Sequence, residues 1–489
     1  MLRITAVLLA LALCSSPLSA QDDFDKQVRS IISAYAAAAA NAADPINSEQ
    51  AIYAGAIPGM LRMLDPHSVF FDPDQFEQLK RMETSTSKGF GSVVSILPGR
   101  VIVLQTLPGT PSQKAGLSPG DEILGINGYI IGQLDTEQLP QLLEQSRQHQ
   151  ARLDVRRPGI PTLLHFTMTP EEMQSPSVDR TFFIGAGIGY IRVTSFDEKT
   201  ADQIKAAIEK LGGDRLAGLV IDLRNNPGGV LTAAVQTCAL FLRPGMKIVT
   251  VRGRHVPEAT ETVPANAKPY GFKMAILMNE KSASSSEIVA GAMQDHDRAT
   301  ILGVPSFGKG LVQSVYPLTQ NTGLALTTAL YYTPSGRSIQ KPLDATRFGL
   351  AATTAHPNRE SEFHTDKGRL VTGGGGIQPD FVVYPPTSNR LRQVLDGSAS
   401  FTNFATQYLR DHKVDTEFEV TPALIDEFRV FLSDRQIRPG LGEWLAEREF
   451  VSNRLKTEVF NQAFGVEKGD EIEAQRDPAI LKALEIIAG

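Results

Sequence analysis

A lysine in a glycine-rich segment is the first candidate for chemistry. Lys309 lies in GVPSFGKG (residues 303–310), one residue short of a phosphate-binding loop, which ends in Lys followed by Ser or Thr. Gly310 stands where the magnesium-ligating hydroxyl would be. The next residues, LVQSVYPL, predict a strand, whereas a phosphate loop opens a helix. We therefore expect Lys309 between two strands, either as an ordinary hairpin lysine or as a catalytic one.

Serines cluster upstream of this lysine. In NEKSASSSEIVAGAMQD (residues 279–295), Ser284, Ser285, Ser286 and Glu287 follow the pattern of a capping box at the start of a helix. A serine at a helix N-terminus is also well placed as a nucleophile, because the free amides and the helix dipole there stabilise an oxyanion. The pattern alone does not separate the cap from the nucleophile.

A serine nucleophile needs a base. The sequence has no Gly-X-Ser-X-Gly elbow and no GDSGG-like block. His296 is near Ser284 in sequence, but the predicted helix separates the two residues. A lysine can serve if burial disfavours its charged form. Lowering a lysine pKa from about 10.4 to about 7.4 costs about 4 kcal/mol, which requires a rigid apolar niche. Phe307, Leu311 and Val312 are candidates to line it.

The N-terminal part of the chain predicts helices. Apolar residues at helical spacing and an alanine run predict a helix over residues 24–43, and a second helix is expected over residues 49–64. The second helix ends at DPHS, where we interpret Asp65 and His67 as parts of a turn set by Pro66 rather than as catalytic residues.

The middle of the chain contains two kinds of pattern. Residues 89–158 predict short strands such as GSVVSI, VIVLQTL and ARLDVRR around one helix, which indicates a small β-rich module. From residue 187, the strand-like runs GYIRVTSF, LAGLVIDLR, KIVTV, KMAILMN and RATILG alternate with helices over residues 201–211 and 230–242. This alternation predicts an α/β layered structure.

After residue 385 the pattern becomes charged and helical. Six apolar residues there are expected as core contacts of a helical extension: Trp444, Leu445, Phe450, Leu455, Val459 and Phe460.

Composition narrows the function. The 489 residues suffice for about three domains. The net charge is −6, and no basic run is present, so we expect no nucleic-acid partner. The eight histidines are scattered, without a spacing that suggests zinc.

The first residues, MLRITAVLLALALCSSPLSAQDD, resemble a signal peptide cleaved after Ala20, with an apolar run too short to span a bilayer. We therefore expect an exported, periplasmic protein without a stable membrane span. Lipid attachment at Cys14 is disfavoured because Leu13 occupies the position of a small residue. Cleavage would leave Cys238 alone, with no internal disulfide, and export argues against ATP as a substrate.

The serine and lysine motifs together resemble a known signature. NEKSASSSEIVAGAMQDHDRATILGVPSFGKGLVQ (residues 279–313) is similar to the catalytic segment of the carboxy-terminal processing proteases, serine endopeptidases with a Ser/Lys dyad. The resemblance implies Ser284 as nucleophile, Lys309 as general base 25 residues later, and Gln313 as the residue that positions the lysine. It implies no metal or organic cofactor.

The resemblance extends over residues 24–383. GFGSVVSI through AGLSPGDEILGING resembles a PDZ domain, and VIDLRNNPGG (residues 220–229) resembles the family's oxyanion segment. The family pattern also makes Asp295 an active-site support, where the alternative is a surface residue at a helix end. The residues that the resemblance implies are the amides of Gly228 and Ser285 for the oxyanion, and Gly89, Phe90, Gly91 and Ser92 for a substrate's terminal carboxylate.

The implied fold is a crotonase-like (ClpP/crotonase) α/β protease core with an inserted PDZ domain, a helical N-terminal segment and a helical C-terminal extension. We place the signal peptide at 1–20, the N-terminal helices at 21–85, the PDZ domain at 86–158, the core at 159–385 and the extension at 386–489. The expected substrates are proteins or peptides with free C-termini. Self-association or an adaptor contact through the extension stays open, as does the role of residues 341–372.

Two alternatives to a protease are a catalytically silent PDZ scaffold and a nucleotide hydrolase. Intact Ser284 and Lys309 argue against the first, and Gly310 against the second. Arg156 and Arg157 lie at the junction between the PDZ domain and the core, and we interpret them as a pair of solvated strand charges. The alternative, which applies if the PDZ domain gates the protease, is that either of them contacts the region of Lys309 and Gln313.

Overall fold

The centre of the molecule is a mostly parallel sheet that is buried on both faces. The computed structural model describes residues 18–83, 86–97, 99–135, 138–341 and 362–489. Within these residues the sheet has six strands, of which five run parallel to one another and the first, β10, pairs antiparallel with its neighbour β11. In spatial order the strands are β10 (Val178–Gly185), β11 (Ile188–Val193), β12 (Gly218–Asp222), β15 (Lys273–Met278), β16 (Thr300–Gly303) and β21 (Phe381–Val382). The predicted α/β layering is present here.

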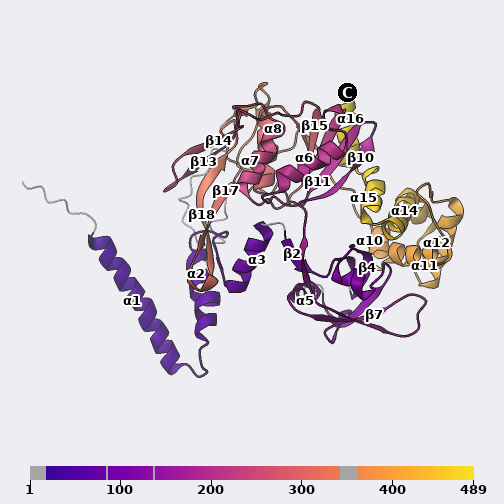
Figure 1. Ribbon diagram of the computed structural model, residues 1–489, viewed down its shortest axis with the longest axis horizontal. Coiled ribbons are helices and arrows are strands. Elements are labelled where there is room, and N and C mark those ends of the chain that lie inside the picture. The colour runs from indigo at the N-terminus through magenta and orange to yellow at the C-terminus, as the bar shows by residue number, and fades with distance from the viewer. Residues whose placement is uncertain (1–17, 84–85, 98, 136–137, 342–361) are drawn as a thin grey trace, which may run out of the picture.

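Alternate residues of these strands enter two different cores. Ile221 and Ile276 belong to the core beneath the helices α6 (Thr200–Lys210), α7 (Leu231–Ala239) and α8 (Ser285–Asp295). Val220 and Ala275 face the other way, into the core formed with the last helix, α16 (Pro478–Ala488). The chain's last helix therefore covers one face of the central sheet (Figure 1), although its sequence lies in the segment expected as an extension.

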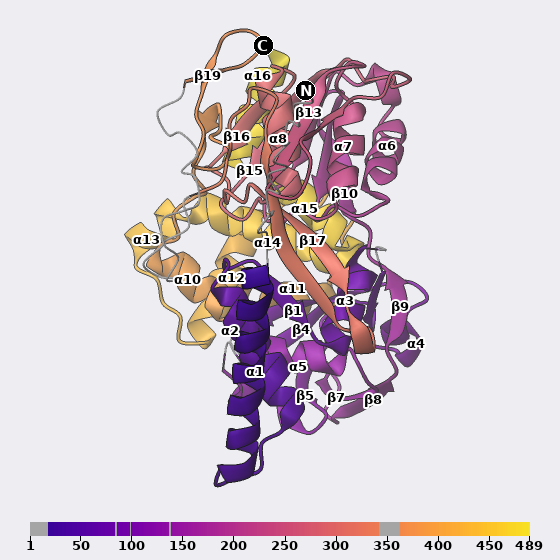
Figure 2. The ribbon, with the colours of Figure 1, turned by 90° about the vertical axis from the view of Figure 1, so that its left-hand side faces the viewer.

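A second sheet joins distant parts of the chain. Its long hairpin, β17 and β18, descends from the core towards the N-terminal helices (Figure 2). Strand β1 pairs with β18, which brings residue 69 beside residue 325. The KIVTV run forms β13 in this sheet and not in the parallel one, so its expected place in the α/β alternation is wrong. The strands are β1 (Val69–Phe71), β13 (Lys247–Gly253), β14 (Ala259–Thr262), β17 (Leu311–Pro317) and β18 (Gly323–Tyr332).

The β-rich module has an antiparallel sheet and a core of its own. Strand β3 is at one edge of this sheet. A two-stranded ribbon of β2 (Thr86–Gly89) and β9 (Glu171–Gln174) connects the module to the rest of the chain. The module comprises β3 (Ser92–Leu97), β4 (Arg100–Thr106), α4 (Pro111–Ala115), β5 (Glu122–Ile126), β6 (Tyr129–Ile130), α5 (Gln138–Ser146), β7 (Ala151–Arg156) and β8 (Leu164–Met168).

The N-terminal segment is helical, as predicted. It contains α1 (Leu18–Asn41), the π-helix η1 (Gln50–Ala56), α2 (Ile57–Arg62) and α3 (Pro73–Glu83). Helix α1 stands away from the body (Figure 1), and its apolar residues Ile31 and Ile32 are more than 60% exposed. The expectations for Cys14 and for most of the signal peptide lie outside the described residues.

The C-terminal segment packs around a cluster of aromatic rings beside the β-rich module (Figure 1). Trp444, Leu455, Val459 and Phe460 are buried as predicted, whereas Leu445 is 57% exposed, so its expected place in the core is wrong. The helices are α10 (Arg390–Gly397), α11 (Ser400–Asp411), α12 (Pro422–Asp434), α13 (Leu441–Ala446), α14 (Arg448–Phe464) and α15 (Val466–Ala474).

Of the segment 341–372, the structure describes a small hairpin of β19 (Phe363–His364) and β20 (Leu370–Val371), and residues 342–361 lie outside the described part. Among the described helices, none combines the length and apolarity that a bilayer crossing requires.

Candidate active site

Ser284 occupies the turn between strand β15 and helix α8. Its backbone has φ 53° and ψ −115°, a conformation that is strained for a residue with a side chain. Such strain costs about 1–3 kcal/mol and is concentrated at functional sites. The Ser284 N–H donates to Glu287 Oε2 at 2.9 Å, which is the glutamate contact predicted for the capping box. Ser284 is half-buried at the N-terminus of α8, the position expected for either a cap or a nucleophile.

Neighbouring serines bind this turn to the segment that follows β12. Ser282 Oγ donates to the carbonyl of Leu223 at 2.8 Å, and Ser286 Oγ donates to that of Asn226 at 3.0 Å. Ser285 Oγ donates to the Gly229 carbonyl at 2.9 Å. These hydroxyls hold the two loops at the carboxyl ends of β12 and β15 against each other.

Gly228 lies directly against Ser284. A β-carbon at position 228 would be 2.7 Å from Ser284 Cβ and 2.8 Å from the Ser285 nitrogen, and φ is +95°, so only glycine fits. The two amides predicted for the oxyanion are thus brought together. The Ser285 amide is at the start of α8, where helix N–H groups lack intrahelical partners. The Gly228 N–H, however, donates to Asn226 Oδ1 at 2.8 Å in this structure.

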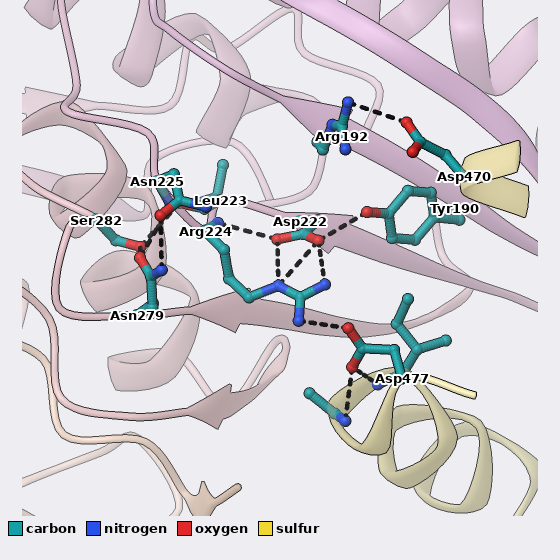
Figure 3. A network of polar contacts seen from close by, with 12 residues as sticks. Tyr190, Arg192, Asp222, Leu223, Arg224, Asn225, Asn279, Ser282, Asp470 and Asp477 are labelled. Carbon is teal, nitrogen blue, oxygen red and sulfur yellow. Dashed lines mark hydrogen bonds and ion pairs between the residues drawn. The ribbon is translucent and has the colours of Figure 1, made fainter. Parts of the chain in front are cut away.

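A partly buried polar network anchors the oxyanion segment to the C-terminal helix (Figure 3). Asp222, at the end of β12, accepts hydrogen bonds from Tyr190 Oη at 2.7 Å and Arg224 Nη2 at 2.6 Å. Arg224 Nη1 also donates to Asp477 Oδ2 at 2.6 Å. Asp477 caps α16 through the N–H of Ala479. The end of the chain is therefore connected to the residues just before Gly228.

Lys309 lies in the link between β16 and β17, as predicted, and a strand follows it rather than a helix. Its Nζ donates to Gln313 Oε1 at 2.6 Å, and Gln313 Nε2 donates to the carbonyl of His67. Asp65 Oδ1 accepts the N–H groups of His67 and Ser68 at 2.7 and 2.8 Å, which confirms the predicted turn. Sequence reasoning missed that this turn lies against the lysine, because the β1–β18 pairing that places it there is long-range.

Burial lowers the pKa of Lys309, and the charges of Asp65 and Glu287 act in the opposite direction. His67 shares this environment: burial and the Lys309 charge lower its pKa, and Asp65 opposes them. The expected lining of the niche is partly wrong, because Phe307 is 47% exposed, although Leu311 is buried.

Two buried side chains connect the backbone of Ser284 to that of Lys309. Glu287 Oε2 accepts the N–H groups of both residues at 2.9 Å, while Oε1 accepts the Gly308 N–H at 2.7 Å. Burial raises the pKa of Glu287, but these hydrogen bonds favour its charged form. Tyr331 Oη lies 3.1 Å from the Ser284 carbonyl oxygen and 2.6 Å from that of Lys309. Sequence reasoning interpreted Glu287 only as part of a cap and did not single out Tyr331.

Asp295 is buried at the other end of α8, so the surface alternative is wrong. Its Oδ1 pairs with the buried Arg337 at 2.8 Å, and its Oδ2 accepts the Ser335 N–H at 2.9 Å. The polar contacts of Asp295 thus hold the turn after β18, at a distance from Ser284 along the helix.

The loop predicted to bind a terminal carboxylate connects β2 to β3. The Phe90 carbonyl accepts the Ser112 N–H and the Gly91 carbonyl accepts the Leu107 N–H, both at 2.8 Å. Gly89 is buried, and Ser92 begins the edge strand β3. The Phe90 and Gly91 carbonyls are therefore already hydrogen-bonded to backbone N–H groups of the β-rich module.

Neither Arg156 nor Arg157 contacts Lys309 or Gln313, so the alternative of a contact with that region is wrong, and the Arg156 side chain is 60% exposed, as expected for a solvated strand charge. Arg156 pairs with Glu122, and Arg157 pairs with Asp121 at 2.7 Å, both within the β-rich module. Antiparallel pairing of β5 with β7 brings these carboxylates opposite the arginines.

Comparisons with known proteins give two family matches and several sequence relatives. The family described as Peptidase family S41 matches residues 187–347, and a PDZ domain matches residues 102–157. The carboxy-terminal-processing protease of Bartonella bacilliformis is 38% identical over 304 residues, 60% of this chain and 68% of that protein. The carboxyl-terminal-processing peptidase 2, chloroplastic, of Arabidopsis thaliana is 32% identical, over 61% of this chain and 60% of that protein.

Among solved structures, the photosystem II D1 C-terminal processing protease has 25% identity, covers 70% of this chain and 84% of its own, and gives a TM-score of 0.40. The sequence relatives are named for one activity, and the S41 match includes both Ser284 and Lys309. The chain belongs to the carboxy-terminal processing proteases of peptidase family S41, with a PDZ domain.

Proposed function

We propose that this protein is an exported, periplasmic serine endopeptidase that cleaves proteins with free C-termini by means of a Ser284/Lys309 dyad. The proposal includes a crotonase-like core at 159–385, a PDZ domain at 86–158 and helical segments on either side. Strand β8 of the 159–385 segment pairs with β7 and so adds a strand to the PDZ sheet. The observation that carries it is the double connection, through Glu287 and Tyr331, between the backbones of Ser284 and Lys309. A connection of this kind keeps the two backbone segments that carry the reacting side chains in a constant relative position.

In the proposed mechanism, neutral Lys309 takes the proton of Ser284 Oγ as that oxygen attacks the scissile carbonyl. Partial burial favours the neutral lysine, and Gln313 fixes the position of Nζ. The ammonium so formed then protonates the leaving amine, and a water molecule releases the acyl group by the same steps.

The amides of Ser285 and Gly228 would hold the oxyanion. For Gly228 this requires its N–H to leave Asn226 Oδ1, so we propose that substrate binding reorients the 227–228 peptide group. Asp295 would support the site indirectly, through the turn that contains Arg337.

The PDZ domain would bind the substrate's C-terminus as an added strand. Within the described residues, β3 is an edge strand that pairs with β4 alone, and β-augmentation at such a strand is common for PDZ domains. Residues 89–92, at the start of this strand, would receive the terminal carboxylate.

Cleavage of unfolded proteins by the wild type and by Ser284→Ala tests the proposal. We expect cleavage by the wild type and by a control, Ser433→Ala on helix α12, and none by Ser284→Ala. Equal cleavage by all three would remove Ser284 from the mechanism. Binding of C-terminal peptides without cleavage by the wild type would favour the silent PDZ scaffold.

A further inference from the structure

A basic cavity separates the PDZ domain from the C-terminal helices. Its volume is about 400 Å³, and its walls come from β4, β5, β7 and residues 157–160 on one side and from α11 and the end of α12 on the other. The two sides meet at its edge, where a β-carbon on Gly120 would lie 3.0 Å from Thr406 Cγ2. Small-molecule sites of about 300–1,000 Å³ occur preferentially at such domain junctions.

Positive charge is concentrated in this cavity, although the whole chain has a net charge of −6. Five arginines line it: Arg100, Arg156, Arg157, Arg410 and Arg435.

Carboxylates of the PDZ domain neutralise part of this charge. Glu122 accepts a hydrogen bond from Arg100 Nε at 2.6 Å and also forms an ion pair with Arg156. Asp121 pairs with Arg157 at 2.7 Å. These three arginines therefore share two carboxylates, and all of them are held in place.

The two arginines from the helical side have no such partner facing them. Within the described part of the chain, the Arg410 side chain makes no hydrogen bond or ion pair, whereas Arg435 Nη1 donates to the Phe431 carbonyl at 3.3 Å. The guanidinium carbon of Arg435 lies 3.5 Å from the centroid of the Phe431 ring, which fixes its orientation. Burial and the charge of Arg100 lower the pKa of Arg435, with Asp434 opposing, so positive charges from the two sides of the cavity repel each other.

We propose that the cavity binds a small phosphate-bearing ligand, held between Arg410 and Arg435 on one side and Arg100 on the other. The five arginines carry five positive charges, and the carboxylates of Glu122, Asp121 and Asp434 offset three of them, which leaves a net charge of two. A phosphate monoester carries roughly −1.5 to −2 at neutral pH, and guanidinium groups match its oxygens in pairs. The bound ligand would connect the PDZ domain to the C-terminal helices.

Isothermal titration of the full chain with inorganic phosphate and with glycerol phosphate tests this site. We expect saturable binding to the wild type, weakened about tenfold or more in Arg410→Gln and in Arg435→Gln. Arg438→Gln is the matched control, because Arg438 is exposed near Arg435 in sequence but does not line the cavity. Equal affinity in all four proteins, or no binding of either probe at millimolar concentration, would overturn the proposal.

A second measurement identifies the source of the phosphate. Cosedimentation with phosphatidylcholine vesicles that contain phosphatidic acid, lost in Arg435→Gln and reversed by glycerol phosphate, would indicate a lipid headgroup. Binding of glycerol phosphate without cosedimentation would indicate a soluble ligand. Both results support the site, and neither readout depends on proteolysis, so the site can fail while the proposed protease stands.

Discussion

In the proposed mechanism, Lys309 has to be neutral before it can accept a proton from Ser284. Because burial lowers its pKa, its neutral form becomes abundant at a lower pH than for a free lysine, whose pKa is about 10.4. The residue still touches water and is near Asp65 and Glu287, whose charges oppose this effect. The proposed base therefore depends on a balance between burial and two nearby carboxylates.

The pH profile of kcat tests the lysine directly. Activity should rise with pH as Lys309 loses its proton, with a midpoint below about 10.4. Lys309→Arg keeps the charge but cannot act as a base, so it should be nearly inactive at every pH, whereas the exposed control Lys281→Arg should behave as wild type. A profile that is flat over this range, or an active Lys309→Arg, would contradict a lysine base.

Glu287 and Tyr331 can be distinguished by the same profile. In Glu287→Gln, the side-chain NH2 group cannot accept the backbone N–H groups that the carboxylate accepts, and one negative charge is lost. Because the positions of Ser284 and Lys309 are then less constrained, kcat should fall by up to about a hundredfold. The midpoint should also move to lower pH, because the Glu287 charge raises the pKa of Lys309. Tyr331→Phe removes hydrogen bonds but no charge, so kcat should fall while the midpoint stays in place. An unchanged midpoint in Glu287→Gln would mean that Glu287 acts through geometry alone.

At the scale of elements, the site is assembled from loops at the carboxyl ends of β12, β15 and β16 and from the turn before β1. Parallel pairing places the first three at one sheet edge. Helix α16 stabilises the loop after β12, because Asp477 at the N-terminus of the helix pairs with Arg224 in that loop. The last helix should therefore affect catalysis without touching the substrate.

Asp477→Asn isolates this contact. Asparagine caps a helix about as well as aspartate, so α16 should keep its cap while Arg224 loses a charged partner. We expect a loss of about 1–2 kcal/mol in the free energy of unfolding, measured with denaturant, together with a lower kcat. Arg476→Gln, whose ion pair with Glu449 is exposed, should change neither quantity much. Lower stability with unchanged kcat would limit α16 to a structural role.

At the scale of the whole molecule, the PDZ domain contacts both the core ribbon and the C-terminal helices. Residues 89–92 lie where the β2–β9 ribbon enters the domain, so a carboxylate bound there would act on the connection to the core. A ligand shifts such an equilibrium by its differential affinity for the two domain positions.

Substrates with a free, apolar C-terminus should consequently be cleaved faster than the same chains amidated at that end. Initial rates on matched peptide pairs measure this difference, with Ser284→Ala as the blank. A free-acid peptide without a cleavable bond should compete for the PDZ domain and reduce the difference. If the intact enzyme cleaves acids and amides at equal rates, the PDZ domain does not act through the terminal carboxylate.

Local sequence determined much of this protein by itself. The spacing of serines and Glu287 placed the start of α8, Gly310 and the β-branched residues after it excluded a phosphate-loop helix, and alternating runs indicated the layered core. These features depend on neighbours within a few residues. Tertiary structure decided the rest. It placed the His67 turn beside Lys309, put β13 in a second sheet and laid α16 on the central sheet. It also buried Asp295 against Arg337 and paired Arg156 with Glu122. Each of these depends on a pairing between residues far apart in the chain, and a local pattern contains no information about such a partner.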